Sequence, residues 1–98
     1  MFVVRDGERI VGFGHAMPGE VVAVYVDPEH TKQGVGRFIL AEGITRARSG
    51  HQEAIRLDAS LNAREFYKKA GFVEVEQKMV RRNDVFLPII IMELRDEI

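Results

Sequence analysis

The hydrophobic period changes along the chain, and the order of these changes restricts the possible folds more than any other feature. Three short apolar segments, Phe2–Arg5, Arg9–Ala16 and Glu20–Val26, precede the first helical period, and Asp-Gly and Pro-Gly pairs separate them. Such pairs supply tight turns between strands. We therefore predict an antiparallel meander, whose third strand has valines on both faces and should be central.

A helical period extends from Gly34 to Arg48, and Gly50 follows where a glycine would end the helix. The strand pattern returns at Ala54–Ala59, so this strand is joined to the third one through a helix, the connection typical of parallel neighbours. The helical pattern predicts one broad buried face formed by Val35, Phe38, Ile39, Ala41, Ile44 and Ala47.

The rest of the chain predicts a second helix and a closing hairpin. Asn62 and Glu65 have the spacing of a capping box, and Gly71 is placed to end the helix. The predicted strands are Phe72–Val80 and Val85–Leu94, with Arg81–Asp84 as the polar tip between them. The predicted class is therefore α/β (α+β): a mixed, mostly antiparallel sheet in the order β-β-β-α-β-α-β-β, within a single domain spanning residues 1–98.

Composition excludes several classes of function. The 98 residues are too few for two domains, and 14 Lys and Arg against 15 Asp and Glu argue against a nucleic-acid or membrane-surface partner. The absence of cysteine removes disulfides, thiolate metal sites and a cysteine nucleophile. No apolar run has the length of a membrane span, and the start lacks a signal-peptide layout, so a cytoplasmic protein is expected. His15, His30 and His51 lack the paired spacing of metal ligands, so no metal is expected.

Gly34-Val35-Gly36 stands at the start of the long predicted helix. A glycine pair there lets backbone N–H groups approach an anion, and the helix start adds partial positive charge, so a phosphate is the expected guest. Ile39 stands where a dinucleotide site would have its third glycine, and the lysine of a nucleoside-triphosphate loop is also missing. Alternatively, the pair is a turn that serves only helix geometry.

Tyr67 is the most informative residue of the second predicted helix. Its phenol could donate a proton to a leaving group. The alternative is an amphipathic tyrosine whose ring packs and whose hydroxyl meets water.

Two stretches together resemble a known superfamily. Val24–Leu40, with Gly34-Val35-Gly36 inside it, is similar to the acetyl-coenzyme A motif of the GNAT acetyltransferases, and Asn62–Phe72 resembles their second motif. The closing strand, Leu87–Glu93, is similar to that of bacterial GNAT enzymes that act on small substrates. The resemblance covers essentially the whole chain.

The resemblance implies transfer of an acetyl group from acetyl-coenzyme A to a primary amine of a small molecule or peptide. Backbone N–H groups near the helix start would hold the pyrophosphate, the third strand would pair with the pantetheine arm, and Lys69 could reach the ribose phosphate. The implied coenzyme-binding positions are Val24, Tyr25, Val26, Thr31, Lys32, Gln33, Gly34, Val35, Gly36, Arg37, Asn62 and Lys69.

Two catalytic roles follow from the same resemblance. Tyr67 matches the position that usually protonates the departing thiolate, and the Val24 N–H would face the thioester oxygen. Glu20 matches the base carboxylate of some members and would deprotonate the amine. Glu20 could equally be a solvated carboxylate beside a turn.

Two departures from the family pattern set further expectations. Thr31 stands where the family has Gln or Arg, which removes a long polar contact to the phosphates but leaves the backbone donors. The family's first strand and first two helices, which usually wall the acceptor pocket, have no counterpart before Phe2. We therefore expect the Phe2–Arg5 strand to lie near an open sheet edge and the chain to form a homodimer. The alternative functions are an acyl-coenzyme A-binding sensor or assembly module without turnover and, less favoured, a structural partner that binds no coenzyme.

Overall fold

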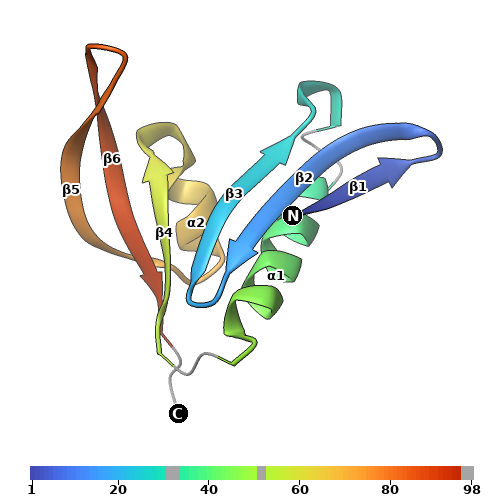
Figure 1. The fold of residues 1–98 in the computed structure, drawn as a ribbon, viewed down its shortest axis with the longest axis horizontal. Helices are drawn as coiled ribbons and strands as arrows, with labels where there is room; N and C mark the ends of the chain where they lie inside the picture. Colours follow the sequence, from blue (N-terminus) through green and yellow to red (C-terminus); the bar gives the residue numbers. More distant parts are fainter. Residues whose placement is uncertain (31–33, 51–52, 96–98) are drawn as a thin grey trace. The chain divides into compact units, whose positions relative to one another are not determined.

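The computed structural model describes residues 1–30, 34–50 and 53–95, and it confirms the predicted order of elements. The described chain is an α+β protein with six strands, mostly antiparallel, and two α-helices (Figure 1). The elements are β1 (Phe2–Asp6), β2 (Arg9–Met17), β3 (Glu20–Val26), α1 (Val35–Arg48), β4 (Ile55–Ser60), α2 (Arg64–Lys69), β5 (Val73–Arg82) and β6 (Val85–Leu94), with short 3-10 helices η1 (Pro28–His30) and η2 (Leu61–Ala63). The chain divides into two compact units, Met1–Gln52 and Glu53–Ile98.

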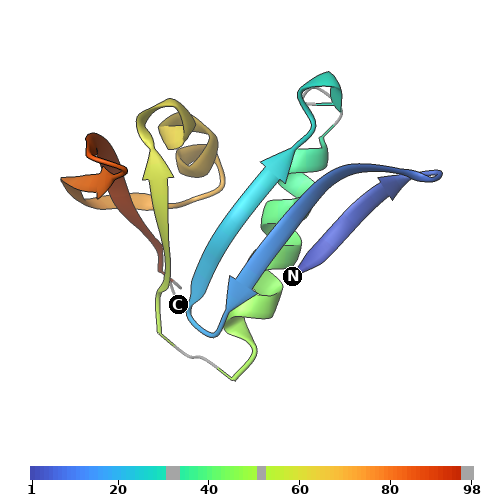
Figure 2. The same ribbon diagram turned by 45° about the horizontal axis from the view of Figure 1, so that its top comes forward.

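In the first unit, β1, β2 and β3 form the predicted antiparallel meander, and α1 packs against one face of it (Figures 1 and 2). Two glycines of β2 let the helix come close. A Cβ atom on Gly12 would lie 2.6 Å from Ile39 Cδ1 and 2.7 Å from the carbonyl oxygen of Tyr25, and one on Gly14 would lie 2.8 Å from Ile39 Cγ2. Larger residues at these positions would therefore push α1 away from the sheet.

The buried face of α1 differs from the predicted one. Ile39, Leu40, Gly43 and Ala47 are buried, whereas Phe38 is 60% exposed and Ala41 is exposed as well. The prediction of the buried face was therefore wrong at Phe38 and Ala41. The helix approaches the sheet through its smallest side chains: a Cβ atom on Gly43 would already lie 3.5 Å from Val21 of β3. The contact stripe is therefore centred near a glycine that carries no hydrophobic signal.

In the second unit, β6 lies between β4 and β5 and pairs antiparallel with both. Ile90, Ile91 and Met92 of β6 are consecutive and buried, as expected for a strand covered on both faces. Along β4, buried and exposed residues alternate as predicted. The β5–β6 ladder continues past the part of β6 that pairs with β4, and its turn residues Asn83 and Asp84 both have positive φ, 49° and 65°. Positive φ at both positions is typical of a tight two-residue hairpin turn.

The capping box predicted at Asn62 is wrong. Asn62 lies inside η2, and the cap positions of η2 and α2 are Ser60 and Ala63, neither of which makes a side-chain capping hydrogen bond. Because the chain enters the helix through a 3-10 turn, the extended backbone of a capping residue belongs to Ser60, with φ −73° and ψ 160°. Gly71 follows α2 with φ +104°, as predicted for a glycine that ends a helix.

Within the described ranges, every helix is too short or too polar to cross a membrane.

Candidate functional site

The N-terminus of α1 exposes backbone donors. Gly34 is the cap residue, with φ 76° and ψ 8° in the left-handed region. Because glycine has no side chain, no side-chain oxygen caps the first N–H groups of the helix. The Phe38 N–H donates to the Gly34 carbonyl at 3.1 Å, so the N–H groups of Val35, Gly36 and Arg37 precede the first helical bond. The first turn of α1 contains no acidic residue. These three N–H groups and the helix dipole suit an anion.

The other residues predicted for this site, Thr31, Lys32 and Gln33, lie outside the described residues.

Strand β3 directs alternate backbone donors to opposite sides. The N–H of Asp27, just after the strand, donates to the Val11 carbonyl of β2 at 2.8 Å. Because donors alternate along an extended strand, the N–H groups of Val26 and Val24 point away from β2, and that of Tyr25 points toward it. The N–H groups of Val24 and Val26 are therefore not used in the ladder with β2.

The Tyr25 side chain is on the face of the meander away from α1. Its ring stacks on Phe13, with centroids 5.2 Å apart and planes 23° apart, and 49% of the residue is exposed.

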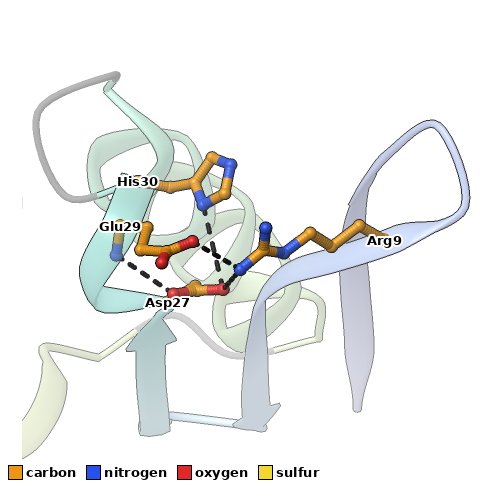
Figure 3. Close-up of polar contacts among 4 residues, drawn as sticks. All are labelled: Arg9, Asp27, Glu29 and His30. Carbon is orange, nitrogen blue, oxygen red and sulfur yellow. Dashed lines mark hydrogen bonds and ion pairs between the residues drawn. The ribbon is translucent and has the colours of Figure 1, made fainter.

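The Arg9 side chain, on β2, forms ion pairs with the turn that follows β3 (Figure 3). Its Nη2 donates to Asp27 Oδ2 at 3.1 Å and to Glu29 Oε2 at 2.7 Å, and Asp27 Oδ1 accepts the Glu29 N–H at 3.0 Å. His30 Nδ1 lies 3.8 Å from Asp27 Oδ2. No sequence pattern indicates this cluster, since Arg9 and Asp27 are 18 residues apart in the chain.

Glu20 begins β3, opposite Met17 of β2, and is half-buried. It lies four residues before Val24, which is roughly 13 Å along a strand. Direct proton transfer needs about 3 Å between the heavy atoms, so Glu20 could act near Val24 only through water.

In the second unit, Tyr67 lies on α2 within an aromatic cluster. Its ring is 5.1 Å from that of Phe66 and 5.9 Å from that of Phe72, both in edge-to-face geometry. Burial raises the pKa of the Tyr67 phenol above its ordinary value of 10.0. The phenol is therefore protonated at neutral pH, the state that a general acid needs.

Asn62 and Lys69 are both exposed. Their neighbours on the helix make local contacts: Arg64 Nε lies 2.7 Å from Glu74 Oε1, and Lys68 Nζ lies 4.0 Å from the same oxygen. Lys69 is thus the more available of the two adjacent lysines.

Comparison with known proteins agrees with this architecture. The family model of the acetyltransferase (GNAT) domain matches residues 1–94. A curated protein, the uncharacterized N-acetyltransferase YafP of Escherichia coli K12, is 31% identical over 70 residues, which are 71% of this chain and 43% of that protein. This chain therefore spans less than half the length of that relative.

Solved structures show the same fold. A GCN5-related N-acetyltransferase from Rhodopseudomonas palustris superposes with a TM-score of 0.89 and 26% identity, over 95% of this chain and 59% of that one. A GNAT family acetyltransferase from Elizabethkingia anophelis with acetyl-CoA bound gives a TM-score of 0.76 at 15% identity, over 95% of this chain and 73% of that one. The family match over residues 1–94 and the fold agree, and the chain belongs to the GNAT acetyltransferase family.

Proposed function

We propose that this protein is an N-acetyltransferase that moves an acetyl group from acetyl-coenzyme A to a primary amine of a small molecule or peptide. The observation that carries the proposal is the start of α1, where Val35, Gly36 and Arg37 present N–H groups after the left-handed Gly34. A diphosphate is the anion that fits this set of donors, as at other helix starts. The acetyl-CoA bound to the Elizabethkingia anophelis relative supports the choice of coenzyme.

In this proposal, the pantetheine arm runs beside β3. The Val24 N–H, which points away from β2, would donate to the thioester oxygen as negative charge develops there. The amine nitrogen attacks the thioester carbonyl carbon, a C–N bond forms, and the C–S bond then breaks. The Val26 N–H points in the same direction as the Val24 N–H and would donate to an amide carbonyl of the pantetheine arm.

Tyr67 is the proposed general acid. The thiolate that leaves would take the phenol proton, and the raised pKa of Tyr67 keeps that proton in place until it is needed. The remaining proposed contacts are with the coenzyme: Asn62 with its arm, Lys69 with its ribose phosphate, and Thr31, Lys32 and Gln33 with its phosphates.

Glu20 is the proposed base, and it would act through water. A protonated amine has no lone pair for attack, so one proton must leave before the C–N bond forms. The distance of roughly 13 Å along β3 requires that one or more waters carry this proton from the amine toward Glu20.

Acetyl-coenzyme A titration by calorimetry tests the binding site. Gly36→Asp should weaken binding by about tenfold or more, because a carboxylate would face the phosphates where the backbone now approaches. Asp is favourable in the first turn of a helix, so this variant should remain folded. Ala41→Asp is the matched control, since it adds the same charge to an exposed position of α1 farther from the helix start. Equal affinities for the two variants would contradict the placement.

A thiol-release assay over a library of amines tests turnover. Release that depends on the amine supports the transferase. Binding without release for any amine would instead support the alternative, an acyl-coenzyme A-binding sensor or assembly module.

We also propose that the chain forms a homodimer. The sheet face of the first unit away from α1 carries Val3, Phe13 and Tyr25 in adjacent register, and β1 is an edge strand. Val3 is 46% exposed and Tyr25 is 49% exposed. An apolar face beside an open edge favours association with a second copy.

A further inference from the structure

Asp27 organises the turn that leaves β3. Its N–H donates to the Val11 carbonyl at 2.8 Å, its carbonyl accepts the His30 N–H at 2.8 Å, and its Oδ1 accepts the Glu29 N–H at 3.0 Å. The Asp27-Pro28 pair suits this geometry, because aspartate caps a helical turn and proline fits its first position. The other carboxylate oxygen of Asp27, Oδ2, accepts a hydrogen bond from Arg9 Nη2, which also donates to Glu29 Oε2.

This turn and the start of α1 lie at the same end of the meander. A Cβ atom on Gly12 would lie 3.4 Å from Val35 Cγ1, and Gly12 is paired with Val26, the residue before Asp27. By sequence, His30 and Gly34 flank the short segment whose residues belong to the coenzyme motif. The turn and the start of α1 therefore lie close together at this end of the meander.

The turn also concentrates negative charge beside a site for an anion. Asp27 and Glu29 are two carboxylates near a helix start that should receive a diphosphate, and the approach of like charges is unfavourable. Arg9 is the cation that contacts both of them. The hydrogen bonds that Arg9 donates, first to Glu29 and then to Asp27, raise the pKa of Arg9, and the hydrogen bond donated by the Glu29 N–H contributes most to lowering the pKa of Asp27.

We propose that Arg9 is a positioning residue for the diphosphate site: it holds the Asp27–His30 turn against β2 and offsets the charge of its two carboxylates, without itself contacting the coenzyme. The proposal rests on the proposed function, since it concerns the affinity for acetyl-coenzyme A. Among the described residues, the ion pairs of the Arg9 guanidinium are with Asp27 and Glu29.

Arg9→Met tests the proposal, because methionine keeps an unbranched stem and removes the charge and the donors. Arg5→Met is the matched control: Arg5 is exposed on the neighbouring strand, and the described part of the chain gives it no ion pair. We expect Arg9→Met to raise the dissociation constant for acetyl-coenzyme A about three- to tenfold, the scale of coupling in an ion-pair network. Arg5→Met should leave it unchanged. Acetyl-pantetheine, which lacks the diphosphate, should bind parent and Arg9→Met equally.

The same substitution in a second background separates positioning from direct contact. In a chain that already carries Asp27→Asn and Glu29→Gln, Arg9→Met should no longer change the affinity, because Arg9 has lost the groups through which it acts. A persistent loss of affinity in that background would show that Arg9 contacts the phosphates and would overturn the proposal. Equal affinity of parent and Arg9→Met for acetyl-coenzyme A would also overturn it.

Hydrogen exchange gives a readout that does not depend on the coenzyme. The Glu29 and His30 amides, which both donate to Asp27, should exchange faster in Arg9→Met than in Arg5→Met. If Arg9→Met does not fold, Arg9→Lys, which keeps a cation, should show a smaller change of the same sign, and no change would contradict the proposal. If the parent chain binds no acetyl-coenzyme A at all, the proposed function fails, whereas the exchange experiment still reports whether Arg9 holds the turn.

Discussion

At the scale of single residues, the proposal that Tyr67 is the general acid can be tested by removing one atom. Tyr67→Phe keeps the ring among Phe66 and Phe72 and removes only the hydroxyl. We expect the turnover number to fall about 10²-fold or more, the usual scale for a lost general acid, with the dissociation constant for acetyl-coenzyme A nearly unchanged. Steady-state kinetics and calorimetry on the same preparation measure the two quantities. An unaltered turnover number would remove Tyr67 from the mechanism.

Asp27 gives a prediction about stability and pH. Its pKa is lowered in the folded chain, chiefly by the Glu29 N–H and then by Arg9, so the folded state favours the ionised carboxylate. This contribution to stability is present above the ordinary pKa of 3.8 and is lost as pH falls from there through the lower folded-state value. Asp27→Asn should therefore be less stable than the parent near neutral pH, with the difference shrinking at lower pH. Urea unfolding at several pH values measures it, and a difference independent of pH would contradict the assignment.

At the scale of elements, the packing of α1 on the meander requires glycine at Gly12 of β2 but not at Gly43 of α1, which faces β3. A Cβ atom on Gly12 would meet a fixed backbone oxygen at 2.7 Å, whereas one on Gly43 would meet Val21 at an ordinary 3.5 Å. Gly12→Ala should lower the free energy of unfolding by about 1–3 kcal/mol through overpacking. Gly43→Ala, its matched control, should raise that energy by about 0.5–1 kcal/mol, because alanine favours helix. Urea unfolding compares the two variants, and the same sign for both would be inconsistent with the close approach at Gly12.

The sequence allowed every strand and both helices to be predicted, because strand alternation, helical period and turn glycines are local signals. The predicted strands at Glu20–Val26 and Val85–Leu94 match the structure at both ends. The start of α1 was predicted from Gly34 and Gly36 for the same reason, since a glycine pair before a helical period is a local signal.

What could not be predicted depends on contacts between distant residues. The exposure of Phe38 follows from where the helix meets the sheet, which Gly43 decides without any hydrophobic signal. The 3-10 turn at Asn62 moved the capping position to Ser60, although the capping-box spacing was present. The ion pair between Arg9 and Asp27 joins residues on different elements, and no spacing rule brings such a pair together.

At the scale of the whole molecule, the proposed homodimer gives a prediction about association. Size exclusion with light scattering should show a dimer at about 100 μM. Val3→Glu should favour the monomer, since it places a charge on the apolar sheet face away from α1. Arg5→Glu is the control, because it introduces the same side chain at an exposed position of the same strand. A parent chain that is monomeric at this concentration and still turns over substrate would contradict the proposal.

The strand order within each unit also affects the sequence of events in folding. In Met1–Gln52, β1 pairs with β2 and β2 with β3, so each ladder closes across a tight turn and little chain entropy is lost. In the second unit, β4 pairs with β6, which is made after β5. The β4–β6 ladder can therefore form only once the last strand is available. Short-range ladders form faster than long-range ones. During synthesis, we therefore expect the helix start proposed for the diphosphate to form while the closing strand is still being made, with α2 and Tyr67 gaining their sheet support last.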